Sequence, residues 1–218
     1  MLEFVEEDHL YVLDGVIIPS VSEILHSIFK DKYKNIPSSI LNAKAEYGTM
    51  VHLSIESYEQ YLKGDDKYYP CDVNDAYSFV VDDYDLDYIQ KESLKQYIKL
   101  KKQNDIHVIE QEQMIHYEDK YAGRFDMIAR IGVDMCLCDI KTTAELDREY
   151  LSWQLSLYEF AYGKKFDKLY AIWLPKKNLG RIVEIERKEE SEILKLIEDY
   201  ENDYPDEERD REREVLGI

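Results

Sequence analysis

Apolar positions along the chain alternate in short runs and recur at helical spacing in longer ones, which predicts a mixture of strands and helices. Residues 4–18 predict a β-hairpin, because two apolar runs flank a turn at Asp14-Gly15. Ser20 and Glu23 then have the spacing of a capping box, so we expect a helix to begin there.

A longer helix is predicted from about residue 41 to residue 62, since Val51, Ile55 and Tyr58 recur on one side of it. The segment that follows is acidic and rich in tyrosine, and then turns into a basic amphipathic stretch. We expect an acidic helical insertion at about residues 64–104.

The second half of the chain predicts mostly strands. Two apolar runs meet at Gly132-Val133 and indicate two strands joined by a tight turn. Further strands are expected at residues 107–117, 168–175 and 181–186, and helices are expected to begin near residues 147 and 189. The elements together predict one α/β domain over residues 1–218, with a mixed central β-sheet flanked by helices.

The register of the predicted hairpin brings charged side chains together. A turn centred on Gly132-Val133 places Asp126 directly opposite Asp139, and alternation along the strand puts Lys141 on the same face as Asp139. Neighbouring carboxylates repel and are costly to desolvate, so such a pair usually shares a divalent cation or a proton. Oxygen ligands suit Mg²⁺ or Mn²⁺. A lysine beside them can orient or deprotonate the water that attacks a phosphodiester.

Three short motifs follow one another in this part of the chain. They are G-x-x-D at Gly123–Asp126, D-x-K at Asp139–Lys141 and Q-x-x-x-Y at Gln154–Tyr158. In their order and spacing they make the sequence resemble the PD-(D/E)XK nuclease superfamily, and within it the RecB-type branch with its phage-encoded exonucleases. Phe125 stands where the superfamily name has a proline.

This resemblance implies a restriction-endonuclease-like core and a metal-dependent deoxyribonuclease. It assigns Asp126 and Asp139 to a Mg²⁺ or Mn²⁺ ion, with the carbonyl of Ile140 as a further ligand. Lys141 would position the attacking water. The remaining pair of the motif, Gln154 and Tyr158, would orient Lys141 or the substrate phosphate.

Two residues outside the hairpin are added to the metal site by the same resemblance. His52 ends a G-x-x-x-H motif that RecB-type nucleases place ahead of the hairpin, where the imidazole is a metal ligand. Without the resemblance, a single histidine on a helix is more often a packed or surface residue. Related sites also use an additional acid, for which Glu112 is the candidate and Glu110 the competitor.

The net charge of −19 at first opposes a nucleic-acid substrate. Residues 65–92 and 198–214 together contribute −14 of it, which leaves −5 on the rest of the chain. DNA would therefore be held locally, by bound cations and a few basic side chains. Lys95, Lys99 and Lys102, on one side of the basic helix, are candidates for contacts with the substrate backbone.

The expected function is that of a stand-alone exonuclease in phage-type recombination or repair, acting on DNA and paired with a single-strand annealing protein. A homo-oligomer that encloses the DNA is a further expected arrangement. Two alternatives stay open: a catalytically silent nuclease-fold protein that binds DNA or regulates, and a nuclease that acts on RNA. A metal-dependent assay on both nucleic acids separates them.

A cytoplasmic location without membrane association is expected, because the sequence shows neither an export signal nor an apolar run long enough to cross a bilayer. The chain has three cysteines, Cys71, Cys136 and Cys138, and two of them fall on a predicted buried strand. Free thiols in a reducing compartment explain this odd number best.

Overall fold

The computed structural model describes residues 1–6, 10–29, 38–64 and 70–203. Its centre is a five-stranded sheet in the order β4-β5-β6-β7-β8, in which β6 and β7 run parallel and all other neighbours antiparallel. The strands are β4 (Ile106–Tyr117), β5 (Tyr121–Ile131), β6 (Asp134–Lys141), β7 (Lys168–Trp173) and β8 (Arg181–Glu184). A mixed sheet flanked by helices was predicted, and this prediction is confirmed.

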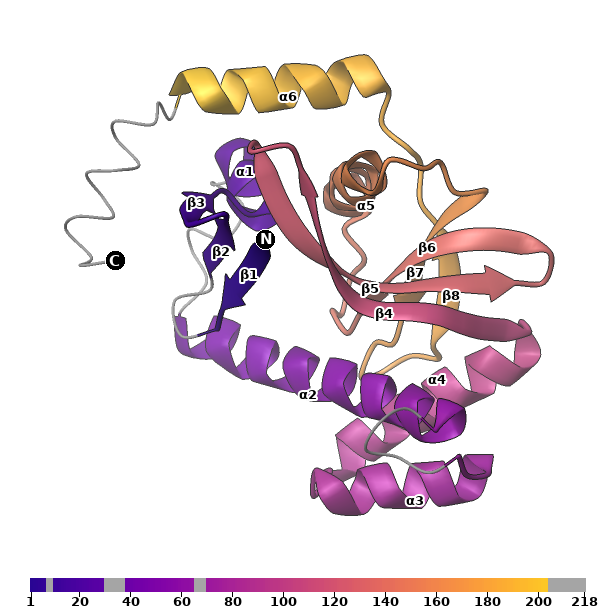
Figure 1. Cartoon of the computed structure of the whole chain (residues 1–218). Helices are drawn as coiled ribbons and strands as arrows, with labels where there is room; N and C mark the ends of the chain where they lie inside the picture. The colour runs from indigo at the N-terminus through magenta and orange to yellow at the C-terminus, as the bar shows by residue number, and fades with distance from the viewer. Residues whose placement is uncertain (7–9, 30–37, 65–69, 204–218) are drawn as a thin grey trace.

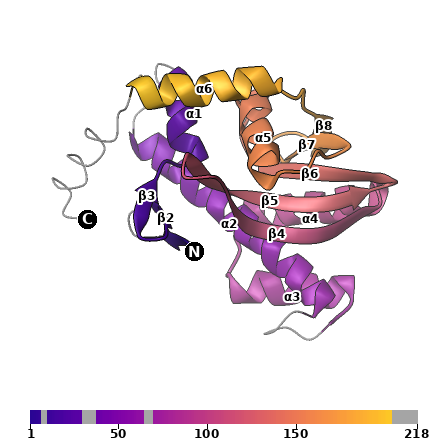
Figure 2. The ribbon, with the colours of Figure 1, turned by 45° about the horizontal axis from the view of Figure 1, so that its top comes forward.

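Helices cover both faces of the sheet (Figure 1). The helices are α1 (Val21–Phe29), α2 (Ser38–Lys63), α3 (Val73–Asp83), α4 (Tyr88–Gln103), α5 (Arg148–Tyr162) and α6 (Glu190–Asp203). Helices α1, α5 and α6 share a buried cluster with Phe125 and Leu137, whereas α2, α3 and α4 share another with Met127 and Ile140. Figure 2 shows the sheet between these two layers.

The segment expected as an acidic insertion contains α3 and α4. Asp72 and Asp87 cap the two helices: Asp72 accepts the backbone N–H groups of Asn74 and Asp75, and Asp87 accepts that of Gln90. Leu94 and Tyr97 of α4 are fully buried in the same cluster as Ile140. The helix α4 is therefore part of the core beneath the sheet, and α3 packs on α2.

The chain begins with a small antiparallel sheet, β1-β2-β3, formed by β1 (Leu2–Val5), β2 (Leu10–Leu13) and β3 (Val16–Ile18). The expected hairpin is β2 and β3, and β1 adds a strand that the pattern did not predict. The capping box is confirmed, since Glu23 N donates to Ser20 Oγ at 3.1 Å and Ser20 N donates to a Glu23 carboxylate oxygen at 2.6 Å. No helix among the described residues has the length and apolar character needed to cross a bilayer.

The register of the β5–β6 hairpin agrees with the prediction. Ile131 pairs with Asp134 and Met127 with Cys138, which centres the turn on Gly132-Val133. The pairing stops at Met127–Cys138, although β6 continues to Lys141. The strands therefore separate at the position of Asp126, and the end of β6 is left open to other groups.

Candidate metal centre

Asp126 lies where β5 leaves β6, and its carboxylate replaces the missing strand pairing. Its Oδ2 atom accepts a hydrogen bond from the backbone N–H of Ile140 at 2.5 Å. A carboxylate that accepts a backbone N–H is held at one place and favoured in its charged form. The other oxygen, Oδ1, faces the imidazole ring of His52.

His52 reaches the same place from α2. Its Nδ1 atom lies 3.4 Å from Asp126 Oδ1, and its Nε2 atom lies 3.0 Å from the carbonyl oxygen of Ile140. The imidazole thus joins the side chain of β5 to the backbone of β6. In α2 the neighbouring residues Val51 and Ile55 are fully buried, which fixes the face that His52 presents.

Glu112 completes the group from β4 through an unusual backbone conformation. Its neighbours Gln111 and Gln113 pair regularly with β5, but Glu112 itself has a φ of +49°. Such a left-handed conformation is strained for a residue with a side chain, at a cost on the order of 1–3 kcal/mol, and is concentrated at functional sites. One ligand atom each of Glu112, His52 and Asp126 lies within 4.8 Å of the other two.

Asp139 and Lys141 lie beside this group and form an ion pair. Lys141 Nζ is 2.6 Å from Asp139 Oδ2, and the Asp139 side chain is almost completely buried. Asp139 was expected as a metal ligand together with Asp126, but it is not part of the group formed by His52, Glu112 and Asp126. Its nearest charged partner is the lysine.

The three acids of the centre, Glu112, Asp126 and Asp139, are partly or fully shielded from solvent, and the pKa of each is shifted. Burial raises the pKa of Glu112 to about 7, and the Asp126 carboxylate adds to the effect. Burial likewise raises the pKa of Asp139 to about 6, against the influence of Lys141. Asp126 differs, because His52 outweighs burial and lowers its pKa. Without a bound cation, Glu112 and Asp139 are therefore protonated more readily than ordinary carboxylates.

The two basic groups, His52 and Lys141, have raised pKa values because the neighbouring carboxylates stabilise their charged forms. Burial disfavours the imidazolium of His52, but the Asp126 carboxylate prevails and raises the pKa to about 9. Burial also opposes the charge of Lys141, yet Asp139 and Asp126 raise its pKa above the usual value. At neutral pH the protonated His52 therefore supplies positive charge between Asp126 and Ile140, where a metal ion would also supply it.

Gln154 and Tyr158 approach the centre from α5. Gln154 Nε2 donates to the Tyr158 hydroxyl at 3.2 Å, as their spacing of one helical turn allows. The ring of Tyr158 packs on the backbone of Gly123, where a Cβ atom would lie only 2.6 Å from Tyr158 Cε1. The glycine of the G-x-x-D motif is thus needed for the close approach of α5 to β5.

One buried side-chain oxygen of the centre, Gln154 Oε1, has no hydrogen-bond donor. Asp139 Oδ2 has only the ammonium group of Lys141, at 2.6 Å, and the described residues contain no other buried side-chain atom of this kind. A buried acceptor without a donor costs about 1–3 kcal/mol. Such atoms, next to two carboxylates, a carbonyl and an imidazole, fit a hydrated hard cation such as Mg²⁺ or Mn²⁺.

Sequence reasoning left open which acid of β4 belongs to the centre and missed one basic residue. Glu110 turns to α5, where its Oε1 atom accepts the Tyr162 hydroxyl at 3.4 Å, so Glu112 is the one near Asp126. Arg124 was not predicted, although it stands within the G-x-x-D motif. Its Nε atom lies 3.1 Å from Glu112 Oε2 and holds that carboxylate.

Comparison with known proteins adds little. No family model matches the chain, and no curated protein matches it. Among solved structures, the chain is similar to the crystal structure of SSO0001 at 19% identity over 68% of this chain and 72% of that one, with a TM-score of 0.34. A likeness this weak carries no argument about fold or function.

Proposed function

We propose that the protein is a metal-dependent deoxyribonuclease that hydrolyses phosphodiester bonds, of the RecB-type PD-(D/E)XK kind. The observation that carries this proposal is the meeting of His52, Glu112 and Asp126 in one group with Lys141 beside it. A structural metal site does not need a buried lysine next to its acids, whereas phosphodiester hydrolysis uses one. Exonuclease action in phage-type recombination, with a single-strand annealing partner, rests on the sequence resemblance.

The metal-binding residues would be His52, Glu112, Asp126 and the carbonyl of Ile140, with Asp139 joining them from the side of Lys141. Their oxygen-rich donor set suits Mg²⁺ or Mn²⁺. When bound, the cation would polarise the phosphoryl group and offset the negative charge that develops on it. Arg124, paired with Glu112, keeps that carboxylate directed toward the site.

Lys141 would orient the attacking water and stabilise the charge on the phosphoryl oxygens. Its raised pKa keeps the ammonium group charged, so it serves as a donor and not as a base. The neighbouring Asp139, at 2.6 Å from the ammonium group, would hold Lys141 in place. Gln154 has an amide oxygen free to position water or Lys141, and its amide nitrogen is held by Tyr158.

The test is an assay with Mg²⁺, Mn²⁺ or a chelator on linear duplex DNA, circular duplex DNA, single-stranded DNA and RNA. We expect metal-dependent loss of linear DNA, with circular duplex spared, and no cleavage by Lys141→Ala. Lys120→Ala is the matched control, because Lys120 lies in the turn between β4 and β5 and pairs with Glu201, outside the candidate centre. Equal cleavage of RNA would reject DNA as the substrate. Binding of DNA without any cleavage would identify a catalytically silent protein.

A further inference from the structure

A row of side chains extends from Lys141 across the neighbouring strands. Lys141 of β6 pairs with Trp173 of β7, and Trp173 pairs with Arg181 of β8. Partners at the same position of adjacent strands point to the same face of the sheet. The indole and the guanidinium therefore share the face of Lys141, which is the face covered by α5.

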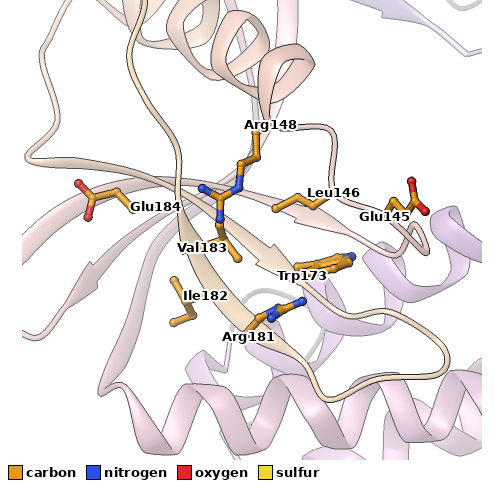
Figure 3. A pocket seen from close by; sticks show the side chains of 8 residues that line it. All are labelled: Glu145, Leu146, Arg148, Trp173, Arg181, Ile182, Val183 and Glu184. Carbon is orange, nitrogen blue, oxygen red and sulfur yellow. The ribbon is translucent and has the colours of Figure 1, made fainter. Parts of the chain in front are cut away.

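This row opens into a hollow of about 610 Å³ at the end of the sheet (Figure 3). The Arg181 guanidinium lies over the Trp173 ring, 4.3 Å from its centroid, and Trp173 Nε1 donates to the Thr143 carbonyl at 2.7 Å. Arg148, from the first turn of α5, lines the same hollow. The indole thus ties Arg181 to the loop that follows Lys141.

The two arginines of this hollow are unusual for so acidic a chain. Among the five arginines that the structure describes, the other three each have a carboxylate partner: Arg124, Arg130 and Arg187. Neither Arg148 nor Arg181 has a carboxylate at ion-pair distance within the described part of the chain. Both are exposed to solvent.

The acids of the hollow do not neutralise these arginines. Figure 3 shows Glu145 and Glu184 at its two ends, with Arg148 and Arg181 between them. Glu184 is already paired with Lys168, at 2.6 Å. The middle of the hollow is therefore a place of positive charge in a protein whose net charge is −19.

We propose that Arg148 and Arg181 bind phosphate groups of the DNA strand beside the scissile bond; this subsite rests on the proposed nuclease function. A guanidinium matches two phosphate oxygens at once and loses little freedom when it is already stacked on an indole. Trp173 is only 8% exposed, so its role is to hold Arg181 and not to stack on a base.

The spacing fits a nucleic-acid strand. Adjacent strands of a sheet are about 4.8 Å apart, so Arg181 lies roughly 10 Å from Lys141 along the row. Phosphates of one DNA strand follow each other every ~3.4 Å along the helix axis, and they lie further apart than this in space because the strand also winds around the axis. Arg181 would therefore meet a phosphate about one or two nucleotides from the one at Lys141.

The experiment compares Arg148→Gln and Arg181→Gln with Arg130→Gln, whose arginine lies at the far turn of the β5–β6 hairpin. Each of the first two should raise KM for DNA about tenfold at unchanged kcat, and lower the salt slope of binding by about 1. Arg130→Gln should change neither value. Arg181→Lys should recover only part of the lost DNA binding, since lysine restores the positive charge but cannot donate two parallel hydrogen bonds to one phosphate.

A second readout uses the two tryptophans of the chain, Trp153 and Trp173. In Trp153→Phe, Trp173 is the only tryptophan, and single-stranded DNA should change the tryptophan fluorescence as the guanidinium above the ring engages phosphate. The change should disappear when Arg181→Gln is added. A change that persists without Arg181 would overturn the assignment of that residue.

The possible results distinguish failure of the phosphate subsite from failure of the nuclease proposal. If wild-type protein cleaves DNA and the two glutamine variants keep its KM and salt slope, the subsite is wrong and the nuclease proposal stands. If wild-type protein cleaves nothing, but binds DNA with a salt slope that both variants reduce, the subsite stands without the activity. A wild-type protein that neither cleaves nor binds DNA would overturn both.

Discussion

At the scale of single residues, the candidate site depends on backbone details more than on residue types. Alternation and the turn at Gly132-Val133 predicted Asp126 directly opposite Asp139; the turn is where it was expected, but strand pairing ends one step before that pair. Glu112 could be named from the sequence only as one of two acids, because a φ of +49° within a strand leaves no mark in the hydrophobic pattern. Hydrogen-bond partners such as the Ile140 N–H also depend on where pairing stops.

The strain at Glu112 gives a first prediction. Glu112→Ala and Glu112→Gly both remove the buried carboxylate, but only glycine adopts a positive φ without cost. We expect the glycine variant to be more stable than the alanine variant by about 1 kcal/mol, measured by urea unfolding in metal-free buffer. At Gln113, which pairs regularly with β5, the order should be reversed. The same order at both positions would contradict the strain.

The protonation of His52 gives a second prediction. Its pKa is raised from 6.5 to about 9 in the metal-free protein, so the imidazole must lose a proton before it can bind a cation. Affinity for Mn²⁺ should therefore rise as the pH increases toward 9, with nearly one proton released from His52 per ion at pH 7.5. Calorimetry in buffers of different ionisation enthalpy measures this release.

The stability of the metal-free protein should fall as the pH rises, whereas the affinity for Mn²⁺ should increase. A folded-state pKa above the unfolded value means that the pair of His52 with Asp126 stabilises the protein fully below about pH 6.5. This contribution is lost as the pH rises through about 9. His52→Ala should remove the part of both dependences that lies between about pH 6.5 and 9, and a variant that still releases nearly one proton per ion at pH 7.5 would remove His52 from the metal site.

At the scale of elements, most helices and strands follow from their patterns, and the errors have physical reasons. Residues 2–5 form β1 because β2 offers them a free edge, which no local signal announces. The segment of α4 was expected as a basic amphipathic helix, and Lys95, Lys99 and Lys102 are exposed on it. The partners of its buried side could not be predicted: Tyr97 donates to the buried Glu59, and Lys101 pairs with the same carboxylate. Whether a strand finds a neighbour or a helix face is buried depends on residues that are distant in the sequence.

The packing of α5 on β5 gives a third prediction. In Gly123→Ala the new methyl group would lie 2.6 Å from Tyr158 Cε1, so α5 must shift. We expect a loss of about 1–3 kcal/mol in unfolding free energy, with loss of activity. Gly48→Ala is the control, because its Cβ atom would lie at 3.5 Å from Thr142 Oγ1 and alanine favours a helix. Equal losses in both variants would show that the contact with Tyr158 is not decisive.

At the scale of the whole molecule, charge is unevenly distributed. The candidate centre combines buried acids with Lys141 at one end of the sheet, and the hollow with Arg148 and Arg181 adjoins it. The α/β architecture could be predicted from the order of the elements. That Arg181 lies on the same side of the sheet as Lys141 could not be predicted. This placement depends on the strand order β6-β7-β8, and the hydrophobic pattern of one strand does not show which strand lies next to it.

This distribution gives the last prediction. With a net charge of −19 and few basic side chains beside the site, the metal-free protein should bind duplex DNA weakly. Ca²⁺, used as a cation that fills the site without supporting cleavage, should neutralise the carboxylates of Glu112 and Asp126 and tighten binding at least tenfold, about 1.4 kcal/mol.

The salt dependence of that complex should indicate only a few phosphate contacts, because nine basic side chains of the described chain, Arg124 and Lys141 among them, are engaged with acids of the protein. Fluorescence anisotropy with labelled duplex, at several salt concentrations with and without Ca²⁺, measures both quantities. Asp126→Asn should bind DNA equally in the two conditions, since it lacks the charge that the ion neutralises. Tight binding with a steep salt slope in the absence of metal would instead require a basic surface other than the one at Arg148 and Arg181.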